Sequence, residues 1–148
     1  MASYEDRFAS SIAKFYLSST QGAGAAGSNV QWDATEFNEG GGFTLGANGV
    51  ITVNFTGYFN VIAQAYQDGA SWGPDSGISF TRPSSLTDQT NSFIFGDSRG
   101  SGSTASLSGL VKCTAGDTFT VNCGPAYNGI WEGDGGKFTY IYLARVAN

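Results

Sequence analysis

The sequence between Gly49 and Tyr66 holds two uncharged apolar runs that are separated by one Thr-Gly step. From Phe59 onward the odd positions read Phe, Val, Ala and Ala, which is the period of two expected for a β-strand with one face in a core. The even positions from Tyr58 onward combine two tyrosines and an isoleucine with an asparagine and a glutamine. Such a face is not typical of a solvent-exposed surface, so we expect this side of the sheet to meet another subunit.

Composition extends the strand prediction to the whole chain. Only 13% of the 148 residues are charged, 22 are glycine, and 41% are hydrophobic with 14% aromatic. The hydrophobic fraction argues against disorder, and the glycine-punctuated β-branched runs predict an all-β sandwich or barrel. The expected strands are 13–20, 30–37, 43–45, 50–55, 58–66, 77–82, 93–95, 105–113, 118–123 and 138–146.

Charge and residue types exclude several function classes. The formal net charge is −5 and only seven Lys and Arg are present, so the chain lacks the basic face that nucleic-acid binding needs. It contains no histidine, which removes Ser-His-Asp and Cys-His catalysis and histidine zinc sites. We therefore expect no catalytic residues and no enzyme; a hydrolase built on two carboxylates is the one enzymatic alternative left.

No segment of the sequence has the features of a secretion signal or a membrane span. The first residues lack a basic and then apolar pattern, and no run approaches the roughly 20 apolar residues that a spanning helix requires. We expect the protein to be made and folded in a cytoplasm, with no membrane span.

Residues 1–12 form a more charged segment ahead of the expected domain, 13–148. Tyr4, Phe8 and Ile12 recur every four residues, which would align them on one side of a helix. A helix this short is marginal in water unless it packs on something. The segment is interpreted as a docking arm that uses these three residues, with a frayed tail as the alternative.

Cys113 and Cys123 are the only cysteines. Both fall at apolar positions of expected strands, where a free cysteine behaves as a small buried hydrophobic residue. We expect two reduced, buried thiols, with a disulfide as the alternative. Two sulfurs without histidine do not make a metal site.

Acidic and aromatic residues in the expected loops are candidates for ligand binding. Trp72, Trp131 and Asp134 lie among Gly, Asn and Asp, an arrangement compatible with a glycan site, although the tryptophans could equally plug the ends of the sandwich. Loop carboxylates are also compatible with calcium, but their spacing matches no known calcium loop. We expect no cofactor, and these acids are interpreted as solvated: Glu39, Asp68, Asp75, Asp88, Asp97, Glu132 and Asp134.

Three blocks in the same order resemble the globular head of complement component 1q, within the tumour-necrosis-factor-like jelly rolls. The first block, 48–59, is similar to that family's Thr-Gly, Phe, Pro, Gly, Tyr-Phe block, although Asn54 and Thr56 stand where prolines are common. The second, 104–121, is similar to its strand, Gly-Asp turn and strand. The third, 137–143, is similar to its closing strand, with Tyr140 in place of glycine.

This resemblance implies a ten-stranded, two-sheet sandwich that trimerises around a three-fold axis, with both termini near one base. The family's secreted members carry a collagen-like stalk, which this sequence lacks. Aromatic side chains on two expected strands would form too large an exposed apolar patch on a monomer, and we expect them at the trimer interface. They are Tyr58, Tyr66, Phe138, Tyr140 and Tyr142.

Together these features predict a homotrimeric structural protein. The hypothesis is a virion protein, a capsid cement (decoration) protein of a tailed phage, docked by its arm on the major capsid protein or another virion protein. It rests on the low charge, the Gly, Ser, Thr and Asn content, and the missing stalk and export signal. The alternative is a receptor- or glycan-binding tip of a fibre or spore-surface protein.

Overall fold

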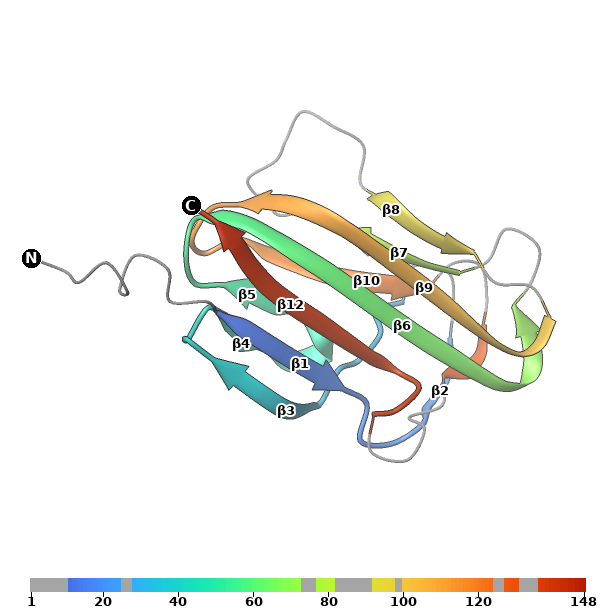
Figure 1. Cartoon of the computed structure of the whole chain (residues 1–148). Helices are drawn as coiled ribbons and strands as arrows, with labels where there is room; N and C mark the ends of the chain where they lie inside the picture. The colour runs from blue at the N-terminus through green and yellow to red at the C-terminus, as the bar shows by residue number, and fades with distance from the viewer. Residues whose placement is uncertain are drawn as a thin grey trace, which may run out of the picture.

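Two five-stranded antiparallel sheets stack to form a sandwich (Figure 1). The computed structural model describes residues 11–24, 28–72, 77–81, 92–97, 100–123, 127–130 and 136–148. Those residues are almost entirely β-strand, with one short 3₁₀ turn at Ala47–Gly49. The all-β jelly roll of about ten strands is therefore confirmed.

The long sheet contains the strands at both ends of the described chain. Its strands, in hydrogen-bonded order, are β3 (Ala34–Glu39), β1 (Ile12–Tyr16), β12 (Tyr140–Ala147), β6 (Gly57–Trp72) and β9 (Gly100–Cys113). The short sheet has the order β4 (Phe43–Leu45), β5 (Ile51–Val53), β10 (Thr118–Cys123), β7 (Gly77–Thr81) and β8 (Ser92–Asp97). A two-stranded sheet pairs β11 (Tyr127–Ile130) with β2 (Gln21–Gly24). First and last strands as neighbours, with all pairings antiparallel, are typical of a jelly roll.

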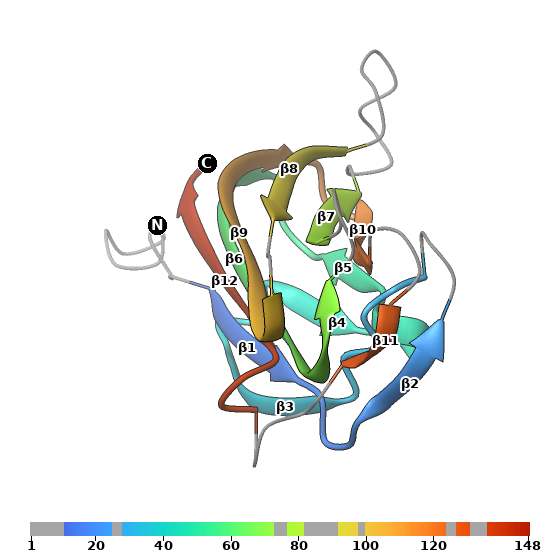
Figure 2. The same ribbon diagram turned by 90° about the vertical axis from the view of Figure 1, so that its right-hand side faces the viewer.

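The core lies between the two sheets, as Figure 2 shows with β12, β6 and β9 on one side and β7, β10 and β5 on the other. The odd positions of β6 point into it: Phe59, Val61, Ala63 and Ala65 are all at most 1% exposed. Phe59 meets Phe43 of the short sheet edge to face, with ring centroids 5.5 Å apart. The period of two in the sequence thus identified the buried face of the central strand.

Several strand boundaries differ from the sequence prediction. The strand expected over 13–20 ends at Tyr16, and the strand expected over 58–66 continues to Trp72. The backbone of β6 pairs with β9 from Gly57 opposite Cys113 to Trp72 opposite Gly100, with a shift of register between Gln67 and Ser71. This partner supplies the hydrogen bonds that extend β6 through a polar stretch whose own sequence predicts a loop.

The described chain begins and ends at the same end of the sandwich (Figure 1). Ile12 lies opposite Ala144, and the backbone amide of Arg145 donates a hydrogen bond to the carbonyl of Ser11 at 2.9 Å. Among the described residues, no helix has the length and apolar character that crossing a membrane requires.

Candidate functional site: the aromatic face of the long sheet

The outward side of the long sheet carries the even positions of β6 and the residues level with them on its neighbours. We call this side the aromatic face. The register places its side chains in rows that cross all five strands from β3 to β9. One row is Phe37, Lys14, Tyr142, Ile62 and Ser108. The next is Glu39, Ile12, Ala144, Asn60 and Leu110.

All five aromatic residues that the sequence assigns to a trimer interface lie on or beside this face. Tyr140 and Tyr142 contact each other edge to face at 5.0 Å between ring centroids. Tyr66 and Phe138 form a second pair at 5.3 Å. Tyr58, from the same side of β6, is 37% exposed, and Tyr142 and Phe138 are similarly open. The structure pairs Tyr140 with Tyr142 and Tyr66 with Phe138, whereas Tyr58 lies apart from them, opposite Ala147. Contact of these residues with another subunit stays a prediction.

A lysine lies among the tyrosines of this face, a position that the sequence analysis did not predict. Lys14 Nζ forms an ion pair with Glu36 and lies 5.4 Å and 5.3 Å from the ring centroids of Tyr140 and Tyr142. Burial of the ammonium would lower the pKa of Lys14. Hydrogen bonds to Glu36 and Tyr142 outweigh that effect, so the pKa lies above its ordinary value. Lys14 is thus a charged, nearly buried centre of the aromatic face.

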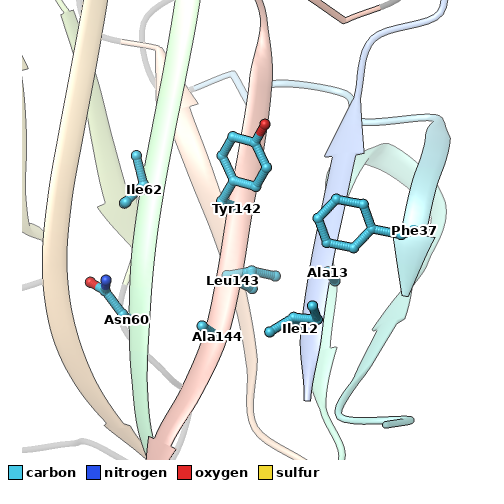
Figure 3. Close-up of a pocket in the computed structure, with 8 residues that line it drawn as sticks. All are labelled: Ile12, Ala13, Phe37, Asn60, Ile62, Tyr142, Leu143 and Ala144. Carbon is cyan, nitrogen blue, oxygen red and sulfur yellow. The ribbon is translucent and has the colours of Figure 1, made fainter. Parts of the chain in front are cut away.

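A shallow apolar hollow of about 160 Å³ opens on the aromatic face, and Figure 3 shows the residues that line it. Its walls come from four strands, and Asn60 is the one lining residue with an amide side chain. The lining residues are Ile12, Ala13, Phe37, Asn60, Ile62, Tyr142, Leu143 and Ala144. Sequence reasoning missed this hollow because β3 and β1 supply one of its sides, and neither strand carries an aromatic run.

The thiols of Cys113 and Cys123 are free and buried. Burial is the main cause that raises the pKa of each to about 12; for Cys113 the negative charge of Asp117 adds to it. The prediction that both thiols are buried is confirmed, and the structure has no bond between them; their reduced state stays a prediction.

The remaining candidates fall largely outside the described residues. Trp131, Asp134, Tyr4 and Phe8 lie there, as do Asp75, Asp88 and Glu132. The backbones of Trp72, Asp68 and Asp97 belong to strands instead of the expected loops, and their side chains are outside the description. Ile12, assigned to the arm, is the first residue of β1. Within the described part of the chain, no group of three or more Cys, Asp or Glu side chains could hold a metal ion.

Comparison with known proteins supports the architecture alone. No protein-family model matches the chain, and no curated protein matches it in sequence. Solved structures do match. Murine APRIL at pH 8.0 is 15% identical with a TM-score of 0.64, covering 93% of this chain and 99% of that one. Eiger TNF from S. frugiperda is 16% identical with a TM-score of 0.65, covering 93% and 92%.

A third match, GITRL from bushbaby, is 16% identical with a TM-score of 0.55 and covers 94% of this chain and 96% of that chain. In each case nearly the whole of both chains superimposes, although identity is far below the level that would establish a shared family. The two-sheet topology and these matches together establish the fold as a tumour-necrosis-factor-like jelly roll.

Proposed function

We propose that this chain is a non-enzymatic structural module that assembles into a homotrimer through the aromatic face. The observation that carries the proposal is where exposed hydrophobic side chains gather. Among the described residues, most large hydrophobic side chains that stay exposed lie on or beside this face: Tyr58, Ile62, Leu110, Phe138 and Tyr142. A patch of this kind on a soluble chain marks an interaction site, and Tyr and Phe are enriched at the centre of protein interfaces.

We expect three subunits because the sequence blocks resemble the complement 1q-like heads, and the shared fold supports this number. A closed ring buries the face of every copy and leaves no copy with an unpaired patch. The polar, low-charge surface outside the face is consistent with a building block that remains soluble as a closed assembly.

The test is sedimentation of the wild type beside an Ile62→Asp variant. Ile62 is 41% exposed at the middle of the face, so aspartate is tolerated in the monomer but would be buried without a partner in the assembly. We expect three chain masses for the wild type and one for the variant. Thr118→Asp, on the exposed side of the short sheet, is the control and should remain a trimer. A monomeric wild type at micromolar concentration would refute the proposal.

The biological setting that we propose is a virion, with the trimer as a capsid cement protein of a tailed phage made in the host cytoplasm. Residues 1–10 would dock on the major capsid protein or another virion protein. The support is the low charge of the chain, its glycine-rich composition, and the position of Ser11 at one end of the sandwich. Purified capsids should bind the full chain and not a chain that lacks residues 1–10, with the trimer intact in both.

A glycan- or receptor-binding tip is the second candidate. The observation that favours it is that β6 carries the backbone of Trp72 to the end of the long sheet farthest from Asn148. A site there would face away from any support at the termini. Binding to a glycan array that is lost in Trp131→Ala, without binding to capsids, would establish this function instead.

A further inference from the structure

We propose that successive copies lock together by a knob and a hollow: Leu110 of one copy enters the hollow of the next, and Lys112 of the first copy pairs with Glu39 of the second. This inference rests on the proposed function, because it assigns the residues through which the ring closes. It also gives different roles to the hollow and to the β9 edge of the aromatic face.

A three-fold ring requires two unlike patches on each copy. Isologous contacts, in which a patch meets itself, produce two-fold dimers, whereas a ring joins one patch of a copy to a different patch of its neighbour. The aromatic face has two such patches. The hollow is lined by β3, β1, β12 and β6, whereas the exposed Leu110 lies on β9, at the edge of the sheet opposite β3.

Leu110 is the projecting residue. It is 59% exposed, more than any other large hydrophobic side chain in the described part of the chain. β9 is an edge strand of the long sheet, and Leu110 lies opposite Asn60, which lines the hollow. The other outward side chains of the described part of β9 are short or polar: Thr104, Ser106, Ser108 and Lys112. Leu110 is therefore the one large apolar side chain on the outward side of the described part of β9.

The hollow has the size and chemistry for this knob. An enclosed apolar cavity of about 150 Å³ holds a benzene molecule, and the hollow measures about 160 Å³. A leucine side chain has fewer heavy atoms than benzene, so it fits within this volume. Seven of the eight lining residues are apolar or aromatic, and Ile62 and Tyr142 are both exposed enough to be covered by an incoming chain.

The charged residues at the two edges of the long sheet fit the same arrangement of neighbouring copies. Lys112 lies on the β9 edge, 5.8 Å from the ring centroid of Tyr58, whereas Glu36 and Glu39 lie on the β3 edge. Glu36 already pairs with Lys14, which leaves Glu39 as the acid for Lys112. Four strand spacings of about 4.8 Å separate the two edges within one copy. Lys112 and Glu39 can therefore meet only between copies, and Glu39 shares the row of Leu110.

The first test is a charge swap read by sedimentation. Lys112→Glu and Glu39→Lys should each shift the trimer toward monomer, because each places like charges together, and the double variant should restore the trimer. Thr118→Lys, which adds a charge away from the face, should have no effect. Two single variants that dissociate without rescue in the double variant would overturn the pairing.

The second test measures the contribution of the Leu110 side chain to association, independently of the charged pair. Leu110→Ala should weaken association about 10- to 100-fold per contact, as expected for loss of a buried leucine, whereas Leu110→Met should retain it because methionine fills a similar volume. A wild-type trimer that Leu110→Ala leaves unchanged would overturn this inference while the proposed function stands. A wild type that is monomeric would overturn both.

The third test maps the contact directly. A Leu110→Cys, Ala144→Cys double variant, oxidised with diamide, should give covalent dimers and trimers on a denaturing gel, and each single variant should give monomers. The native thiols are buried and do not interfere. Cross-links that form in Ala144→Cys alone would show a face that meets itself and refute the ring. Loss of the trimer on deleting residues 1–10 would show that this segment, not Leu110, fills the hollow.

Discussion

Replacing Glu36 by alanine should destabilise the protein more than replacing Lys14 by methionine, although the two changes break the same ion pair. The side chain of Lys14 is 11% exposed, whereas that of Glu36 is 49% exposed. Lys14→Met removes the nearly buried charge and keeps an unbranched side chain against the two tyrosine rings. Glu36→Ala leaves the ammonium in place with only the hydroxyl of Tyr142 and the rings as partners.

The expected magnitudes follow from that difference in burial. A surface ion pair contributes about 0–1 kcal/mol, so Lys14→Met should lower the free energy of unfolding by about 1 kcal/mol at most. A buried donor that loses its partner costs about 1–3 kcal/mol, which is the loss expected for Glu36→Ala. Glu36→Gln, which keeps an acceptor oxygen but not the charge, should fall between the two.

Denaturant unfolding at one fixed protein concentration measures these differences, since an oligomer's stability depends on concentration. The pH dependence gives a second readout. Because the pKa of Lys14 is raised on folding, its contribution is complete below about 10.4, the ordinary lysine value, and is lost as pH rises through the folded value. The difference between wild type and Lys14→Met should therefore shrink above about pH 10. Equal losses in Glu36→Ala and Lys14→Met, or a larger loss in the latter, would refute the reasoning.

Two further predictions concern the core and the turns. Cys113 and Cys123 should resist a thiol reagent in the native protein at pH 8 and react fully after unfolding, because burial raises each pKa to about 12; fast labelling of native protein, read by mass spectrometry, would contradict this. Gly49→Ala should cost clearly more stability than Gly41→Ala. Both glycines have positive φ, +70° and +65°, a conformation that costs other residues about 1–2 kcal/mol, but a Cβ at Gly49 would also strike the carbonyl of Val30, whereas one at Gly41 meets nothing within 4 Å. Equal melting temperatures would count against the steric argument.

The central strand could be predicted from sequence because its period of two is local. Phe59 and Val61 are buried and Tyr58 and Ile62 exposed, as the alternation indicates. The extension of β6 to Trp72 could not be predicted, because it depends on β9, whose pairing residues lie 28 to 36 positions further along the chain, from Trp72 opposite Gly100 to Gln67 opposite Ser103. Strand length in a sheet is decided by the partner as much as by the strand's own residues.

The aromatic part of the candidate site was visible in the sequence, and the hollow and the lysine were not. Tyr140 and Tyr142 attract attention as a pair two residues apart. Lys14, in contrast, reads as an ordinary charged residue until β1 is placed between β12 and β3, where Glu36 and the tyrosine rings reach it. A neighbour across a sheet is set by topology, and topology is not a local property of the sequence.

The antiparallel pairing of β1 with β12 gives the molecule two poles. A peptide fused ahead of Ser11 or behind Asn148 would leave from the same pole, next to the contact between Arg145 and Ser11. The opposite ends of β6 and β9, where Trp72 lies across from Gly100, are about 50 Å away along a strand of 16 residues. A scaffold with this geometry can be tethered at one pole without crowding the other, so it suits the display of foreign sequences at the distal pole.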